Sequence, residues 1–194
     1  LGKSRAQPLP AGETLTTGRW QATVLQVVRG ERANKAAPII HEKNQPLGVG
    51  MEYLAVYLRV RSVSREEQPL WFGQGNFSLL NASGTVYERP KGTVAPRPSL
   101  DGYLLPGGTM EGWALLQAPL GEGDLTLRFA TSYERGEERF LSIDLPEDRA
   151  APPHLGHLWL GPGLFECQAY YEASATPALQ QAAPQGQKYF VLLL

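Results

Sequence analysis

The chain has 194 residues, of which 42% are hydrophobic, and this is enough apolar material for one folded domain and part of a second. Its 18 basic and 19 acidic side chains nearly balance, which excludes the basic excess of nucleic-acid-binding proteins and of polybasic membrane-surface proteins. The 21 glycines and 16 prolines are scattered as turn residues, a distribution typical of many short strands and few helices.

The N-terminal quarter of the chain contains one predicted strand. Residues 1–12 hold two prolines and no apolar periodicity, so they are predicted to be a linker. Alternating apolar and polar residues over 20–28 predict a half-buried strand. A long polar connection follows over 31–50, and its first part, 31–37, is compatible with a helical turn.

The clearest strand pattern covers residues 53–63. One face of this strand would carry the apolar residues Leu54, Val56, Leu58 and Val60, and the other Tyr57, Arg59 and Arg61. Arginine at alternate positions requires one face to be in contact with water, which indicates an antiparallel sheet and not a buried parallel one.

Five further strands complete the first domain. They are predicted over residues 77–80, 85–87, 110–117, 125–129 and 139–145. No segment with a helical period links successive strands, which excludes βαβ units. The number of strands and the long crossover loops favour an all-β fold, an immunoglobulin-like antiparallel β-sandwich over residues 13–148.

The C-terminal part is predicted to form a partial second β unit. Residues 149–163 are rich in proline and glycine and are predicted to be a linker. Residues 164–194 are either a truncated second repeat, since 186–194 resembles 50–58, or added strands of one larger sandwich. Two strands cannot bury an apolar face alone. The segment from Tyr189 to Leu194 would therefore pair with an edge of the first domain or with a second chain, in a strand-swapped homodimer.

Four landmarks occur in order along residues 13–145. They are the strand 20–28 followed by Arg29-Gly30-Glu31-Arg32-Ala33; Pro46, Gly50 and Tyr53 before the strand 54–63; Leu105-Pro106-Gly107-Gly108 with Gly112 and a strand closing on Ala118-Pro119; and the strand 125–129. Together they resemble a bacterial extracellular domain family of unknown function, whose immunoglobulin-like fold is shared with the telokin-like, immunoprotective secreted antigens. Ser62 or Ser64 stands where that family usually has Asn. The resemblance implies export to the cell exterior, often with a lipid or membrane anchor, and it transfers no catalytic residues.

Motifs for metal binding and catalysis are sparse. His154 and His157 are candidate zinc ligands, because they are three residues apart and close to Glu166 and Cys167. A structural zinc site needs four rigidly held ligands, and a proline-rich loop with one cysteine is a poor frame, so we expect no metal. No Gly-x-Ser-x-Gly elbow and no phosphate-binding loop occur. The chain is therefore predicted not to be an enzyme and to hold no cofactor.

The aromatic residues are the candidate interaction site. Trp71 and Phe72 are adjacent at the end of the long strand, and adjacent strand residues face opposite sides. We favour a Trp71 that caps the core. The alternative is that one of the two is exposed and, with Tyr103, anchors a glycan or a protein partner. Trp20 and Trp113 are expected in the core.

These patterns predict a non-enzymatic domain, extracellular or in the cell envelope, that mediates interaction with a protein or a surface ligand. It would be secreted and anchored by a segment outside this sequence. The longest apolar run, 189–194, is far shorter than the roughly 20 residues that cross a bilayer. Alternatives are a carbohydrate-binding module, with Trp71 and Tyr103 along one groove, and a structural spacer of a tandem-repeat surface protein. An enzyme would instead require a pocket of convergent acids or the two histidines His154 and His157.

Overall fold

The computed structural model describes residues 1–41, 43–132 and 137–145, together with the backbone of six short strands between residues 157 and 193. The chain divides into two compact units, Leu1–Pro152 and Pro153–Leu194. No helix in the described part of the chain is long and apolar enough to cross a membrane.

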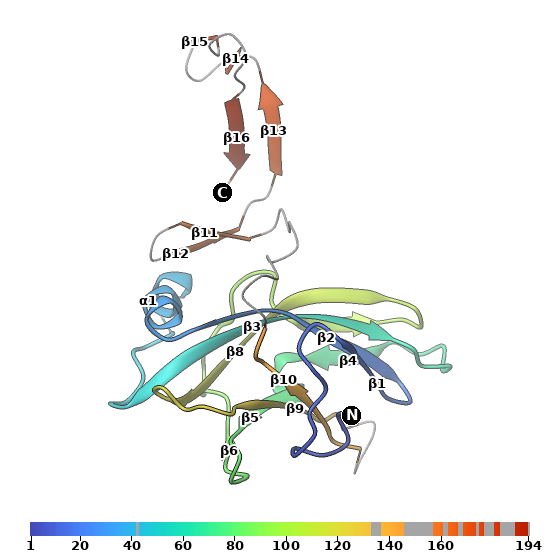
Figure 1. Ribbon diagram of the computed structural model, residues 1–194. Helices are drawn as coiled ribbons and strands as arrows, with labels where there is room; N and C mark the ends of the chain where they lie inside the picture. Colours follow the sequence, from blue (N-terminus) through green and yellow to red (C-terminus); the bar gives the residue numbers. More distant parts are fainter. Residues whose placement is uncertain are drawn as a thin grey trace. The chain divides into compact units, whose positions relative to one another are not determined.

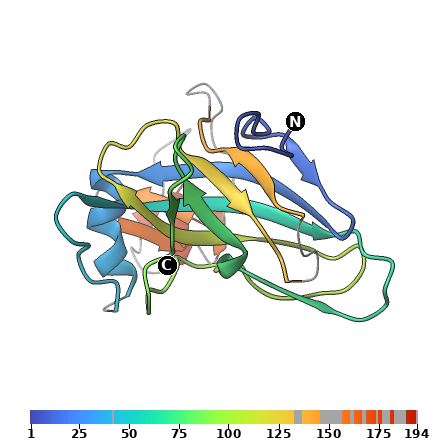
Figure 2. The ribbon, with the colours of Figure 1, turned by 90° about the horizontal axis from the view of Figure 1, so that it is seen from below.

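The first unit is built from two four-stranded antiparallel sheets (Figure 1). The first sheet contains, in spatial order, β1 (Thr14–Thr16), β2 (Trp20–Arg29), β3 (Met51–Ser62) and β8 (Thr109–Pro119). The second contains β10 (Arg139–Ser142), β9 (Thr126–Phe129), β5 (Phe77–Leu80) and β6 (Val86–Tyr87). In Figure 2 the green, yellow and orange strands of the second sheet lie in front of the blue and teal strands of the first. This confirms the predicted all-β antiparallel sandwich.

The core lies between the two sheets and follows the alternation of β3. Its four apolar residues Leu54, Val56, Leu58 and Val60 are each fully buried, and they join a cluster with Leu79 and Leu127 from the second sheet. On the opposite face of β3, Arg59 and Arg61 are exposed. The predicted period of two in exposure is therefore observed over the last part of the strand. Tyr57, predicted on the water-facing side, is instead 5% exposed because it packs against Trp113, and Tyr53 and Ala55 on the same side are also buried.

The sequence patterns did not predict three short strands and a 3-10 turn, and they predicted a helical turn that is shorter than the observed helix. The short strand β1 extends the first sheet, while β4 (Leu70–Gly73) and β7 (Asp101–Leu104) pair antiparallel with each other. The 3-10 turn η1 (Gln74–Asn76) follows β4. The expected turn at 31–37 is a longer helix, α1 (Glu31–Ile40). This helix buries Ala33 and Ala37, and its Asn34 side chain accepts a hydrogen bond from the Tyr53 backbone N–H at 2.7 Å.

The N-terminal segment, expected to be a linker, packs on the edge of the second sheet. The Leu9 N–H donates to the Phe140 carbonyl at 2.9 Å, and the Ser142 N–H donates to the Leu9 carbonyl at 2.7 Å. Ala11 is 5% exposed and belongs to the core cluster. These contacts cover part of the β10 edge, which would otherwise present unpaired backbone groups, and they make residues 1–12 part of the first unit.

Among the described residues of the second unit there are three antiparallel strand pairs. They are β11 (His157–Leu160) with β12 (Gly163–Glu166), β13 (Ala169–Ala173) with β16 (Tyr189–Leu193), and β14 (Ala175–Thr176) with β15 (Gln181–Ala182). The last strand, expected to pair with the first domain or with another chain, pairs with β13 inside its own unit.

Candidate functional site

The candidate metal ligands lie mostly outside the described part of the chain. His154 and Cys167 are not among the described residues, and of His157 and Glu166 only the backbone is described, as register partners in β11 and β12. The residues that the structure does describe contain no group of three or more metal-ligating side chains. His41 ends α1, and its Nδ1 accepts a hydrogen bond from the Lys43 backbone N–H at 3.1 Å.

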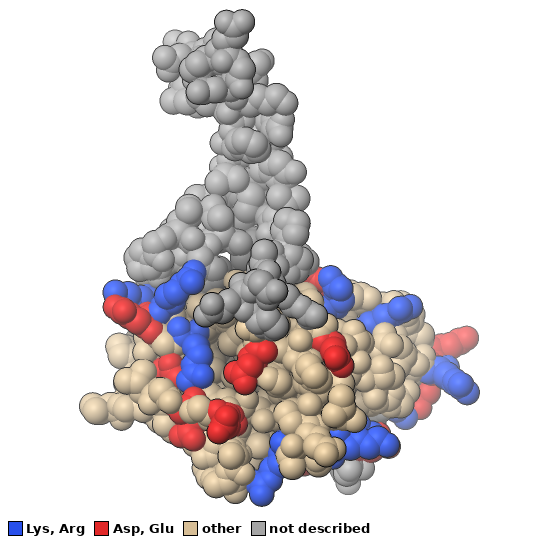
Figure 3. All heavy atoms as spheres, in the orientation of Figure 1, with Lys and Arg blue, Asp and Glu red and all other residues tan. Residues whose placement is uncertain are grey.

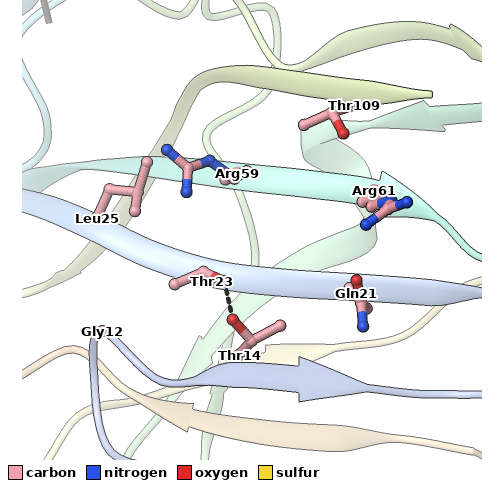
Figure 4. Close-up of a pocket in the computed structure, with 8 residues that line it drawn as sticks. All are labelled: Gly12, Thr14, Gln21, Thr23, Leu25, Arg59, Arg61 and Thr109. Atoms are coloured by element: carbon pink, nitrogen blue, oxygen red, sulfur yellow. Dashed lines mark hydrogen bonds between the residues drawn. The ribbon is translucent and has the colours of Figure 1, made fainter. Parts of the chain in front are cut away.

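A shallow polar groove of about 350 Å³ crosses the outer face of the first sheet. It is lined by Gly12, Thr14, Gln21, Thr23, Leu25, Arg59, Arg61 and Thr109 (Figure 4). The Thr14 and Thr23 hydroxyls hydrogen-bond each other at 2.9 Å across β1 and β2. The groove is therefore a row of hydrogen-bonding groups around two arginines from one strand, β3.

One of the two arginines in the groove is neutralised by Glu111. The Arg59 Nε donates to Glu111 Oε1 at 2.6 Å, and the Tyr57 hydroxyl donates to Glu111 Oε2 at 3.2 Å. Burial of the phenol and the nearby negative charge of Glu111 raise the pKa of Tyr57 to about 12. Charge elsewhere is also mixed, since Lys and Arg are interspersed with Asp and Glu over the visible face of the first unit (Figure 3). The surface in this view carries no single-sign field that would attract a polyanion.

A second hollow, of about 460 Å³, lies between the N-terminal segment and the second sheet. Its lining is Arg5, Ala6, Pro8, Asn81, Ala82, Asp124, Leu125, Thr126, Ser142 and Asp144. Polar and apolar residues are mixed in this lining, and it has no aromatic side chain.

The exposed aromatic residues lie on the β4–β7 pair. Trp71 is 40% exposed and Tyr103 is 72% exposed, and they are direct register partners across the two strands. Phe72 is fully buried, with its ring centroid 4.8 Å from Trp20 and 5.8 Å from Phe129. Phe72 therefore takes the place in the core that we expected for Trp71, and it is removed from the set of exposed candidates. Trp20 is fully buried in the core, as expected. Trp113 is also fully buried, but it packs against Tyr57 on the other face of the first sheet and does not belong to the core cluster.

The indole of Trp71 is held over the backbone of Gly73, two residues further along the same face of β4. A Cβ atom at Gly73 would lie 2.4 Å from Trp71 Cη2, 2.5 Å from Cζ2 and 2.6 Å from Asp101 Oδ1. Gly73 has an extended backbone with φ −159°, so glycine serves here to leave space and not to permit an unusual conformation. The indole of Trp71 fills the space that a side chain on Gly73 would occupy.

Asp101 is the polar neighbour of this indole. It is the register partner of Gly73, and its Oδ2 accepts a hydrogen bond from Gln74 Nε2 at 3.1 Å. Gln74 is itself buried, 7% exposed, and its Oε1 accepts from the Leu115 N–H at 3.4 Å. We call the surface formed by Trp71, Gly73, Asp101 and Tyr103 the aromatic platform. The spacing Trp-x-Gly, which places both residues on one face of a strand, was the sequence signal that could have located it.

Comparisons with known proteins agree on the fold only. No protein-family model matches the chain, and a search of curated proteins finds no match. Among solved structures the chain is similar to the YjhA protein of Bacillus subtilis, with 18% identity, a TM-score of 0.46, and coverage of 70% of this chain and 99% of YjhA. It is also similar to YcdA of Bacillus subtilis strain 168, described as a "putative lipoprotein", with 15% identity, a TM-score of 0.50 and coverage of 68% of this chain. The match spans only 38% of YcdA. The likeness to YcdA shows a shared β fold.

Proposed function

We propose that this chain is a non-enzymatic domain of the bacterial cell exterior or envelope that binds a protein or a surface ligand through the aromatic platform. The description of YcdA as a "putative lipoprotein" supports the location, because a lipid anchor holds a protein at the membrane surface. The sandwich, by this proposal, is an immunoglobulin-like domain of the telokin-like secreted-antigen type.

The backbone at the landmark glycines supports that family assignment. Gly30 follows β2, Gly50 precedes β3, and Gly107 precedes β8, and all three have positive φ, at 68°, 80° and 79°. Glycine adopts this region without the steric cost that a Cβ imposes. The landmark positions of the resemblance are thus positions at which this fold needs glycine.

The exposure of Trp71 next to Tyr103 is the observation that carries the binding function. The sandwich buries Trp20 and Trp113 completely. The exposure of Trp71 therefore does not arise because the fold is unable to bury an indole. Tryptophan and tyrosine dominate the energetics of many interfaces, since they contribute a large contact area for a small loss of conformational entropy. Two such residues side by side on a rigid strand pair form a ready anchor.

The proposal is tested by sedimentation of the purified chain with cell envelopes isolated from the bacterium that produces it. Wild type is expected in the pellet, and the Trp71→Ala/Tyr103→Ala variant is expected to be retained at least tenfold less. The matched control is Val86→Ala/Leu120→Ala, which removes two other apolar side chains that are 40% and 63% exposed. Equal retention of the platform variant and wild type, or no retention of wild type, contradicts the proposal.

A further inference from the structure

We infer that the ligand of the aromatic platform is a glycan, with a pyranose ring stacked on Trp71 and one of its hydroxyls donating to Asp101. This inference rests on the proposed function and specifies the chemistry of the ligand. It follows from the area, the shape and the polar neighbours of the platform.

The exposed area fits a sugar better than a protein. Aromatic side chains present about 150–250 Å² each, so side chains that are 40% and 72% exposed offer roughly 250 Å² together. A stable protein interface buries about 800 Å² on each partner. A protein partner would therefore have to contact many residues beyond the platform, whereas the two exposed rings alone can cover a small ligand such as a sugar. The Cβ atoms of residues directly opposite on paired strands are about 5 Å apart, so the side chains of Trp71 and Tyr103 begin at neighbouring points on one face of the β4–β7 pair.

The shape of the platform is preorganised for a flat ligand. The indole lies over the Gly73 backbone and is confined beside Asp101, while the ladder of β4 with β7 fixes the strand beneath it. The C–H groups of a pyranose ring make one apolar face that stacks on an aromatic ring. Because the indole is already held in place, binding costs little side-chain entropy.

The carboxylate of Asp101 suits the hydroxyl groups of a sugar. Sugar hydroxyls require hydrogen-bond acceptors, and a carboxylate supplies several lone pairs. Gln74 uses Oδ2 of Asp101 and thereby sets the orientation of the carboxylate. The other oxygen, Oδ1, lies within 2.6 Å of the same Gly73 Cβ position that the indole occupies. An acceptor thus lies directly beside the stacking surface, where it can receive a hydroxyl of the stacked ring.

The test uses the envelope assay on two preparations. The first is protein-free glycan, obtained by boiling the same envelopes in detergent and digesting them with protease. The second is detergent-solubilised envelope protein, immobilised after removal of insoluble glycan. Wild type is expected to bind the glycan and not the immobilised protein. Trp71→Ala is expected to reduce glycan binding at least tenfold, and Trp71→Phe, which keeps a smaller stacking ring, to reduce it less. Asp101→Ala is expected to weaken binding about tenfold, and Asp144→Ala, at a polar site away from β4 and β7, is the matched control.

The outcomes separate this inference from the proposed function. Binding of wild type to the protein preparation alone, still weakened by the platform substitutions, overturns the glycan assignment and leaves the proposed function standing. Glycan binding that is equal in wild type, Trp71→Ala and Asp101→Ala also overturns the assignment, because the sugar would then be held elsewhere. Binding to both preparations that is insensitive to every platform substitution overturns the proposed function itself.

Discussion

Trp71 and Gly73 form one structural unit, in which the ring of the first lies where a side chain on the second would be. The distance from the Gly73 Cβ position to Trp71 Cη2 is 2.4 Å, which is shorter than any stable carbon–carbon contact. The platform therefore depends on a residue that contributes no side-chain atom to it. Substitutions at Gly73 test the geometry of the platform without removing any of its functional groups.

Gly73→Ala is expected to push the indole away from the strand and to reduce stability by less than about 1 kcal/mol, because the atoms that the new methyl group meets are the far ends of the Trp71 and Asp101 side chains, which can move toward solvent. Quenching of tryptophan fluorescence by acrylamide should increase as Trp71 becomes more accessible. Gly75→Ala is the control, since a Cβ there has no neighbour within 4 Å. Identical quenching in Gly73→Ala and wild type would show that the indole does not depend on the glycine.

The adjacent residues Trp71 and Phe72 should differ sharply in their contribution to stability. Phe72 is fully buried between Trp20 and Phe129, so Phe72→Ala is expected to cost about 3–5 kcal/mol. Trp71→Ala removes a side chain that is 40% exposed, and its cost is expected to be about 1 kcal/mol. Urea denaturation of the two variants measures both values. A larger loss of stability for Trp71→Ala than for Phe72→Ala would contradict the assignment of Phe72 to the core and of Trp71 to the surface.

Gly112 has a structural role distinct from that of the platform. A Cβ on this residue would lie 2.7 Å from both the Leu100 nitrogen and the Ser99 carbonyl carbon. These are backbone atoms, which cannot rotate away, so Gly112→Ala is expected to destabilise the fold by about 1–3 kcal/mol. Gly123→Ala, with no atom within 4 Å of its Cβ position, should leave stability nearly unchanged. A Gly112→Ala variant as stable as wild type would show that the close approach of residues 99 and 100 is not required.

An ion pair with a buried carboxylate and one with an exposed carboxylate give a further comparison. Glu52 is 2% exposed, and its Oε1 accepts from Arg29 Nη2 at 2.5 Å and from the Gly121 N–H at 3.3 Å. Glu52→Ala is expected to cost about 1.5–3 kcal/mol, as for hydrogen bonds to charged groups. Glu66 pairs with Arg19 at 2.7 Å on the surface, where its side chain is 54% exposed. Glu66→Ala is expected to cost less than about 1 kcal/mol. Equal losses in chemical denaturation would contradict this ranking.

The long strand β3 was predictable because its alternation of apolar and polar residues extends over many positions. The strand predicted at 53–63 is observed as Met51–Ser62, with the expected residues facing the core. Its alternation extends over enough residues for a helix to be excluded. The inner face of β3 and the exposure of Arg59 and Arg61 could therefore be derived without coordinates, whereas the short strand β1 and the burial of Tyr57 on the outer face could not.

The aromatic platform could be predicted only in part. β4 and β7 have four residues each and both contain glycine, so neither offers a run of alternation that identifies a strand. The sequence implied that Trp71 and Phe72 face opposite sides, but it did not determine which of them faces the core. That choice depends on the pairing of β4 with β7 and on the space above Gly73. Both are tertiary features, because they join residues about 30 positions apart.

The high pKa of Tyr57 makes stability depend on pH at the alkaline end. The phenol ionises near pH 10 in the unfolded chain, but burial and Glu111 raise its pKa to about 12 in the folded protein. Below pH 10 both states hold the proton and the contribution of Tyr57 to stability is complete. Between pH 10 and 12 the unfolded state loses its proton first, so stability falls as the pH rises.

Tyr57→Phe tests this linkage. The variant cannot ionise at this position, so its free energy of unfolding should fall less than that of wild type between pH 9.5 and 11.5. Urea denaturation at a series of pH values measures the difference, and comparison of each protein with itself at pH 8 removes the constant cost of the lost hydrogen bond to Glu111. Absorbance at 295 nm gives an independent reading, because wild type should acquire one more tyrosinate than the variant, and only near pH 12. If the two proteins lost stability in parallel as the pH rises, the Tyr57 hydroxyl would be open to solvent. The packing of Tyr57 against Trp113, with ring centroids 4.9 Å apart, would then not shield the hydroxyl from water.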